Sequence, residues 1–238
     1  MQMAPSRPTS LLDLHIPECY TKLGLTEPFL LYDSGNDSSR FLIFATENNL
    51  TTLASSSQWF CDGTFSVTPL LFTQMYSIHC EFQDGVLPMV YVLMSRMTKN
   101  DYVNVLEALN TLNPNLAPES IMTDYERSAI SAFSDVFPLA GLRGCFFHFS
   151  QCLWKRFSKI PEALLLYKNN ADFALNIKCV AALAFCPPSE VISAFEKLMK
   201  TLFFTSNEFL RPFLIYFEEV WIGKPTEKGR RSPLFNIS

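Results

Sequence analysis

The chain has 238 residues, of which 48% are hydrophobic and 18% charged, so it is long enough for one large domain or one domain with a helical insertion. Its formal net charge of −4 argues against a protein that grips nucleic acid through an overall basic surplus. Seven irregularly spaced cysteines and the lack of an apolar run of about 18 residues argue against a disulfide framework and a membrane span.

Residues 1–28 are polar and are expected to form a loosely ordered leader. Short apolar or alternating runs then predict strands over residues 29–32, 41–45, 58–65, 71–82 and 86–94. A helix is expected at 47–57, where Leu50 and Leu53 share one face. A turn around residues 83–85 makes the last two strands an antiparallel hairpin.

After residue 99 the hydrophobic period changes to that of helices. Helices are predicted over residues 100–112, 125–133, 147–157, 189–202 and 207–220, and short strands over 120–124 and 139–146. The first of these helices has Val103, Leu106 and Leu109 on one face and Asn100 or Asp101 as its N-cap. Three antiparallel strands followed by α/β units indicate a mixed-sheet, ribonuclease-H-like α/β fold.

Beyond the last predicted strand no further strand is expected, so residues 159–223 are predicted to be an all-helical insertion after a core at 29–158. Residues 224–238 carry a basic run of Lys224, Lys228, Arg230 and Arg231 and are predicted to be a solvated tail, cut short at Ser238.

Two aspartates lie where strands of this predicted sheet end. Asp62 precedes Gly63 at the end of the 58–65 strand region, and Asp124 closes the 120–124 strand. Ligands gather at the carboxyl ends of strands in open α/β sheets, and the first and fourth strands of this fold are neighbours. Adjacent carboxylates there would suit a two-metal site holding Mg²⁺ or Mn²⁺. The simpler alternatives are that Asp62 is a turn residue and Asp124 a helix N-cap.

Three separate motifs resemble those of Mutator-like element (MULE) transposases. They are the strings Trp59-Phe60-Cys61-Asp62-Gly63-Thr64-Phe65, Ile121-Met122-Thr123-Asp124-Tyr125-Glu126 and Gly144-Cys145-Phe146-Phe147-His148. The resemblance covers residues 29 to 223 in order. It implies a three-carboxylate DNA-cleaving site in which Asp62 and Asp124 are catalytic residues and the first two metal ligands.

The resemblance implies a third acid, normally a glutamate beyond a helical insertion. The motif in which that glutamate usually lies is absent from this sequence, and Glu218 is a weak candidate to replace it. Cys145 and His148 are expected to support the active site or contact DNA. No zinc is expected, because the other cysteines and histidines lack the spacing of a four-ligand site.

These observations predict a transposase-derived domain for metal-dependent DNA cleavage and strand transfer in the nucleus. It would bind DNA weakly and non-specifically by itself, with a homo-oligomer left open and no membrane partner. The main alternative is a catalytically dead, domesticated or decayed remnant that acts as an interaction module, in the nucleus or the cytoplasm. An ordinary ribonuclease-H-type nuclease is a third alternative, but it leaves the Cys-x-x-His segment and the insertion without a purpose.

Overall fold

The computed structural model describes residues 8–35, 37–227 and 229–235. The chain forms two compact units, Met1–Arg143 and Gly144–Ser238. The first unit is built around a large mixed sheet, and the second is mainly helical. The predicted mixed α/β class is therefore confirmed.

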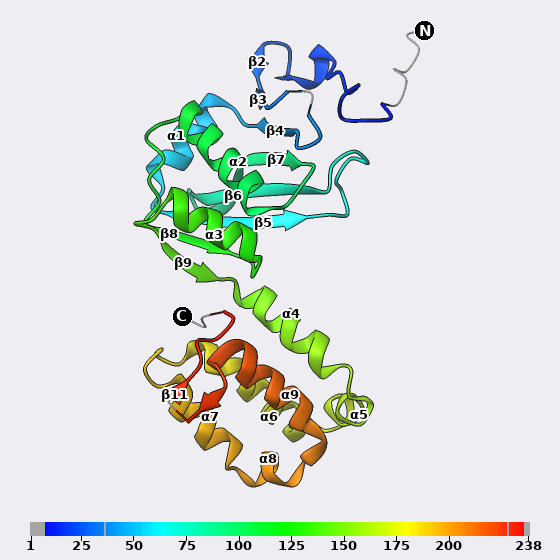
Figure 1. Cartoon of the computed structure of the whole chain (residues 1–238), viewed down its shortest axis with the longest axis vertical. Coiled ribbons are helices and arrows are strands. Elements are labelled where there is room, and N and C mark those ends of the chain that lie inside the picture. Colours follow the sequence, from blue (N-terminus) through cyan, green and yellow to red (C-terminus); the bar gives the residue numbers. More distant parts are fainter. Residues whose placement is uncertain (1–7, 36, 228, 236–238) are drawn as a thin grey trace. The chain divides into compact units, whose positions relative to one another are not determined.

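Seven strands of the first unit form one sheet in the order β3-β4-β7-β6-β5-β8-β9 (Figure 1). The strands are β3 (Leu30–Asp33), β4 (Phe41–Phe44), β5 (Gln58–Thr64), β6 (Gln74–Phe82), β7 (Gly85–Met94), β8 (Ser120–Thr123) and β9 (Gly141–Gly144). The strands β5, β6 and β7 form an antiparallel meander, and β8 pairs with β5 in parallel. A register shift between Leu30 and Tyr32 interrupts the pairing of β3 with β4.

The antiparallel hairpin of β6 and β7 turns more tightly than the sequence indicates. Phe82 already pairs with Gly85, which leaves Gln83 and Asp84 as the two turn residues. Gln83 takes the left-handed conformation, with φ of 54°, that such a turn requires. The alternation of Tyr76, Ile78 and Cys80 is confirmed, since all three side chains are buried in the core.

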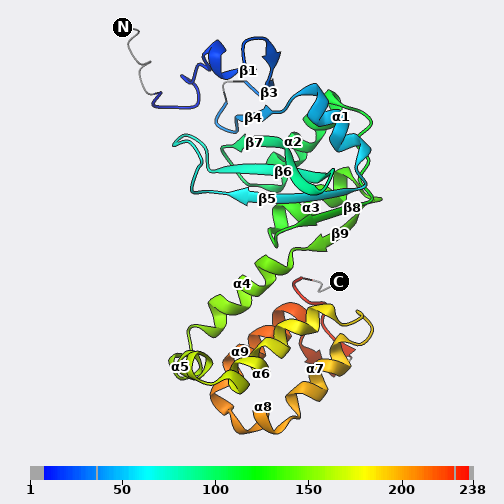
Figure 2. The same ribbon diagram turned by 180° about the vertical axis from the view of Figure 1, so that it is seen from behind.

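Three helices complete the first unit: α1 (Glu47–Ser55), α2 (Lys99–Leu112) and α3 (Arg127–Val136). Both views show α2 and α3 side by side over the same face of the sheet (Figures 1 and 2). The N-cap of α2 is Thr98, not Asn100 or Asp101, because Thr98 and Asp101 form a reciprocal capping box. The helix buries Tyr102, Val105, Leu106 and Leu109, and Val103 is partly buried and packs against the same core.

Part of the leader is tied to the sheet by Arg40. The helical turn η1 (Glu18–Tyr20) and the two-residue strands β1 (Lys22–Leu23) and β2 (Glu27–Pro28) lie within it. The buried Arg40 side chain donates to Leu11 O at 2.9 Å, to Leu14 O at 2.7 Å and to both carboxylate oxygens of Asp33. Residues 1–7 of the predicted leader lie outside the described residues.

The second unit contains more helices than the sequence predicted (Figure 2). They are α4 (Phe146–Phe157), α5 (Pro161–Asn169), α6 (Ala171–Ala182), α7 (Val191–Met199), α8 (Leu202–Ser206) and α9 (Arg211–Phe217), with short 3-10 helices η2 (Leu183–Phe185) and η3 (Glu208–Leu210). The helix expected at 207–220 is broken into η3, α9 and the π-helical turn η4 (Glu218–Ile222). Aromatic side chains form its core, and Phe149 packs edge-on against Trp221 with ring centroids 4.7 Å apart.

The expectation of a strand-free last third is wrong at one point. Strands β10 (Pro225–Thr226) and β11 (Gly229–Arg230) pair in a small antiparallel hairpin. Arg230 is correspondingly not a solvated tail residue, because its guanidinium binds Glu218, Glu196 and Gly223 O. Lys228 of the basic run and residues 236–238 lie outside the described residues.

Candidate metal centre

Asp62 lies inside β5 rather than at its end. The strand continues through Gly63 to Thr64, and Asp62 pairs with Ser77 of β6. The interpretation of Asp62 as a turn residue is therefore wrong, because its backbone belongs to the sheet ladder. Ser77 donates from Oγ to Asp62 O at 3.3 Å and lies 2.9 Å from Nε2 of His79. His79 is thus the hydrogen-bonded strand residue that its alternating position indicates.

Asp124 follows β8 directly and closes a short turn before α3. Its Oδ1 accepts the backbone N–H of Glu126 at 3.1 Å. The helix begins at Arg127 and its N-cap position is Glu126, so the interpretation of Asp124 as the N-cap is also wrong. The turn leaves Oδ2 of Asp124 without a hydrogen-bond partner among the described residues.

The parallel pairing of β5 with β8 sets the relation between the two aspartates. The register joins Gln58 to Ser120, Trp59 to Ile121 and Phe60 to Met122. Asp62 and Asp124 each lie two residues beyond the last of these pairs, and neighbouring strands run about 4.8 Å apart. Asp62 shares its face of the sheet with Phe60, and Asp124 directly follows the last residue of β8, so the register brings the two residues to neighbouring positions on adjacent segments. The predicted adjacency of the first and fourth strands is confirmed.

The electrostatics of the neighbouring Cys61 thiol reflect both carboxylates. Burial is the largest cause that raises the pKa of Cys61, a hydrogen bond with Tyr76 opposes it, and the charges of Asp124 and Asp62 raise the pKa further. Burial also lowers the pKa of His79, against an opposing effect of the Asp62 charge. Asp62 and Asp124 therefore both lie within electrostatic reach of the Cys61 thiol.

Three residues that the sequence reasoning gave no role form a polar chain beside the aspartates. Tyr102 of α2 donates from its hydroxyl to Glu126 Oε2 at 2.6 Å, and Gln74 of β6 donates from Nε2 to the Tyr102 hydroxyl at 2.5 Å. Burial raises the pKa of Glu126, the Tyr102 hydrogen bond lowers it, and the Asp124 charge raises it further. Glu126 stands in the motif that pointed to Asp124, and Gln74 begins the segment Gln74-Met75-Tyr76-Ser77-Ile78-His79 that also resembles the MULE core, so both had a signal in the sequence.

The two aspartates are ligands of the type that a hard divalent cation binds, but a metal centre of the expected kind needs a third acidic ligand. Asp62 and Asp124 offer carboxylate oxygens, the kind of ligand that Mg²⁺ and Mn²⁺ prefer. The hydrogen bonds that the described residues donate to the Asp124 carboxylate all go to Oδ1. In the described part of the chain, no group of three or more His, Cys, Asp or Glu side chains has an arrangement that could hold a metal ion. The residues therefore fit two ligands of a metal centre, and the third acid is not among them.

The other predicted site residues belong to the second unit. Cys145 occupies the N-cap position of α4 without a side-chain cap bond, and His148 lies in the first turn of that helix beside the ring of Phe147. Glu218 begins η4 and binds Arg230. Because Asp62 and Asp124 lie in the first unit, the expected approach of these residues to the acidic centre stays a prediction.

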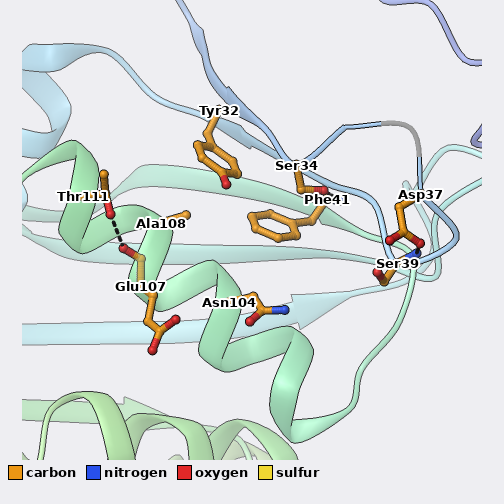
Figure 3. Close-up of a pocket in the computed structure, with 9 residues that line it drawn as sticks. All are labelled: Tyr32, Ser34, Asp37, Ser39, Phe41, Asn104, Glu107, Ala108 and Thr111. Carbon is orange, nitrogen blue, oxygen red and sulfur yellow. Dashed lines mark hydrogen bonds between the residues drawn. The ribbon is translucent and has the colours of Figure 1, made fainter.

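A polar pocket of about 430 Å³ opens on the first unit between the β3–β4 hairpin and α2. Figure 3 shows Tyr32 and Phe41 on one side and Asn104, Glu107 and Thr111 of α2 on the other. None of the predicted site residues lines this pocket. A second hollow of about 460 Å³ lies within the helical unit and is lined mainly by apolar side chains, among them Trp154, which is 44% exposed.

The decisive comparison is with a family model. Residues 58–152 match the MULE transposase domain. The resemblance to MULE transposases is thus confirmed over this segment. The matched segment includes both aspartates of the candidate centre as well as Cys145 and His148, and Glu218 lies outside it.

Other comparisons add little to the MULE match. No curated protein matches the chain. A solved structure described as a Drosophila P element transposase strand transfer complex is similar at 10% identity and a TM-score of 0.32, over 73% of this chain. The chain spans 54% of the length of that structure's chain. Within the described residues, no helix is both long and apolar enough to cross a bilayer.

Proposed function

We propose that this chain carries the catalytic core of a MULE transposase with a ribonuclease-H-like fold, which cleaves DNA and transfers strands in a metal-dependent reaction. One observation carries the proposal: inside the segment that matches the MULE domain, β5, which contains Asp62, pairs in parallel with β8, which Asp124 directly follows. The strand order β7-β6-β5-β8-β9 supports the fold assignment, because three antiparallel strands are followed by β8, which is parallel to β5 and reached through α2, and by β9, which is reached through α3.

Asp62 and Asp124 would hold Mg²⁺ or Mn²⁺ through carboxylate oxygens. When bound at such a site, divalent cations lower the pKa of an attacking water or 3′-hydroxyl and stabilise the leaving oxygen of the phosphodiester. The chain supplies the fixed positions of the ligands. Asp62 is held within the β5–β6 ladder, and Asp124 is oriented by the Glu126 N–H, so little reordering of the protein would accompany metal binding.

The partner in this proposal is DNA, bound weakly and without sequence preference by this chain alone. The formal net charge of −4 opposes a tight phosphate grip. Arg230, in the densest basic run of the sequence, is already paired with Glu218 and Glu196. A nuclear location follows from the same proposal, since the DNA substrate lies there.

A second candidate function is that of a non-catalytic remnant that serves as an interaction module. It is favoured by the lack of a three-acid cluster among the described residues and by the engagement of Glu218 with Arg230. This alternative has the same fold and family as the first proposal but involves no DNA cleavage or strand transfer.

Nicking of supercoiled plasmid DNA in the presence of Mn²⁺ tests the proposal. Asp62→Asn and Asp124→Asn should each abolish nicking, while Asp84→Asn, at the exposed tip of the β6–β7 hairpin, should retain it. Activity that survives both substitutions would remove the assigned centre. A wild-type chain that folds, binds Mn²⁺ and does not nick would favour the remnant.

A further inference from the structure

A continuous chain of contacts joins the backbone beside Asp62 to the carboxylate of Asp124. It runs from Gly63 through Gln74, Tyr102 and Glu126, and it crosses β5, β6, α2 and the turn after β8. All of these residues belong to the first unit. The chain is separate from the pairing of β5 with β8 and reaches the same two segments by another route.

The first link is steric. Gln74 is fully buried, and a Cβ atom added at Gly63 would lie 2.7 Å from Gln74 Oε1, closer than side chains approach in proteins. Gly63 therefore provides the space that the Gln74 amide oxygen occupies. That oxygen has no hydrogen-bond partner among the described residues. A buried acceptor without a partner costs free energy, so the other contacts of Gln74 must keep the amide in this position.

The second and third links are hydrogen bonds with fixed directions. The Tyr102 hydroxyl has one hydrogen, which it donates to Glu126 Oε2. Its oxygen can therefore only accept from Gln74 Nε2. This direction fixes the amide of Gln74 with Nε2 toward Tyr102 and Oε1 toward Gly63. The last link is the Glu126 backbone N–H, which donates to Asp124 Oδ1 at 3.1 Å.

We propose that Gln74, Tyr102 and Glu126 are positioning residues that hold the Asp62–Gly63 and Asp124–Glu126 segments at a fixed separation for metal binding. The inference rests on the proposed function, because it assumes that Asp62 and Asp124 are metal ligands. Residues that orient metal ligands commonly change metal affinity by about tenfold or more when they are removed. None of the three needs to touch the metal for this effect.

The test is Mn²⁺ affinity of the full chain, measured by the electron paramagnetic resonance signal of free Mn²⁺. Tyr102→Phe removes the hydroxyl and keeps the buried ring, and it should weaken Mn²⁺ binding by about tenfold. Val105→Ala is the matched control: Val105 is equally buried on the same helix, and its side chain has no hydrogen-bonding group, so the substitution loosens the core without breaking a polar contact. It should leave the affinity within about twofold of wild type.

A second pair of variants keeps the proposal testable if Tyr102→Phe does not fold. Glu126→Gln keeps an acceptor for Tyr102 and should retain Mn²⁺ affinity, whereas Glu126→Ala removes the acceptor and should weaken binding as Tyr102→Phe does. Equal losses in Tyr102→Phe and Val105→Ala would show general loosening of the core and overturn the proposal. So would unchanged affinity in both Tyr102→Phe and Glu126→Ala.

Asp62→Asn and Asp124→Asn separate failure of the inference from failure of the proposed function. If both aspartate variants lose Mn²⁺ and Tyr102→Phe and Glu126→Ala do not, only the positioning role is overturned. If the aspartate variants bind Mn²⁺ as wild type does, the metal centre itself is wrong and the positioning role falls with it.

Discussion

Arg230 donates from Nη1 to Glu218 Oε1 at 2.8 Å, and this pair fastens the β10–β11 hairpin to the π-helical turn η4. The same guanidinium reaches Glu196 of α7 at 3.1 Å and Gly223 O at 2.7 Å. Glu218 thus has a structural partner within its own unit. To act as a third metal ligand it would have to give up that partner.

Glu218→Gln should lower the free energy of unfolding of the helical unit by about 1.5 kcal/mol, because a charge-assisted hydrogen bond to a partly buried guanidinium is weakened. Urea denaturation followed by circular dichroism measures the change. Glu219→Gln is the matched control, since its partner Lys224 is largely exposed and such pairs contribute about 0.5 kcal/mol or less. Equal effects of the two substitutions would contradict the structural role of Glu218.

Gly223 terminates η4 with a backbone that other residues rarely adopt. Its φ is 91°, and an added Cβ would lie 1.8 Å from Arg231 O. Gly223→Ala should therefore destabilise the helical unit by about 3 kcal/mol, from backbone strain and a contact with no room to relax. Gly229→Ala, with φ of 120° and no atom within 4 Å of the added Cβ, carries the backbone cost alone. If thermal denaturation shows a larger loss of stability for Gly229→Ala than for Gly223→Ala, the close approach of Gly223 to Arg231 O is refuted.

Arg40→Met should destabilise the first unit by about 2 kcal/mol, because Leu11 O, Leu14 O and Asp33 all lose a charged donor. It should also increase cleavage by trypsin in the leader. Limited proteolysis with mass spectrometry locates the cut. Arg96→Met, an exposed residue that donates to Ser38 Oγ, should change stability by no more than about 0.5 kcal/mol.

Acid should weaken the same attachment through Asp33. Burial opposes ionisation, but hydrogen bonds from Arg40 and the Gly35 N–H, with the charge of Arg40, hold the pKa of Asp33 below the usual value of an aspartate. The folded state therefore binds this proton less readily than the unfolded state, so the stabilisation is present above about pH 4 and is lost as pH falls through the folded pKa. Urea denaturation of wild type and Asp33→Asn at pH 6 and pH 3 should show a difference in stability that shrinks at pH 3. A difference independent of pH would disprove the ion pair.

Cys61 should resist alkylation in the folded protein. Its thiol is buried, and burial raises its pKa, so the reactive thiolate is scarce. Iodoacetamide at pH 8 should modify the exposed Cys19 within minutes and reach Cys61 only after urea is added, as peptide mass spectrometry can show. Rapid labelling of native Cys61 would mean that the core around the candidate centre opens.

Much of the sheet was predictable, because alternation of apolar residues on β6 and the apolar run on β7 report directly on burial. The last third was less predictable. Its helices are short and broken, and Phe side chains occur on exposed as well as buried positions, so no clean period marks their ends. Helical spacing predicted the face of α2 that carries Val103, Leu106 and Leu109, and all three pack in or against the core, but it gave no sign that Tyr102 is buried beside Tyr76.

The candidate centre was predictable only in part, for a related reason. Asp62 and Asp124 follow from motif and strand position, whereas Gln74, Tyr102 and Glu126 meet only through tertiary packing. The glycine after Asp62 suggested a turn, but its lack of a side chain makes room for the Gln74 amide within a continuing strand. Local sequence carries no record of that contact.

The parallel pairing of β5 with β8 has a consequence for the order in which the protein is made. Strands β5, β6 and β7 pair with sequence neighbours and can form as soon as they leave the ribosome, but β8 emerges only after α2. A nascent chain that ends within α2 holds Asp62 and has no second carboxylate beside it. The pair of acids is assembled by a contact of long sequence separation, which is slow to form, so the proposed cation site would be completed late in folding.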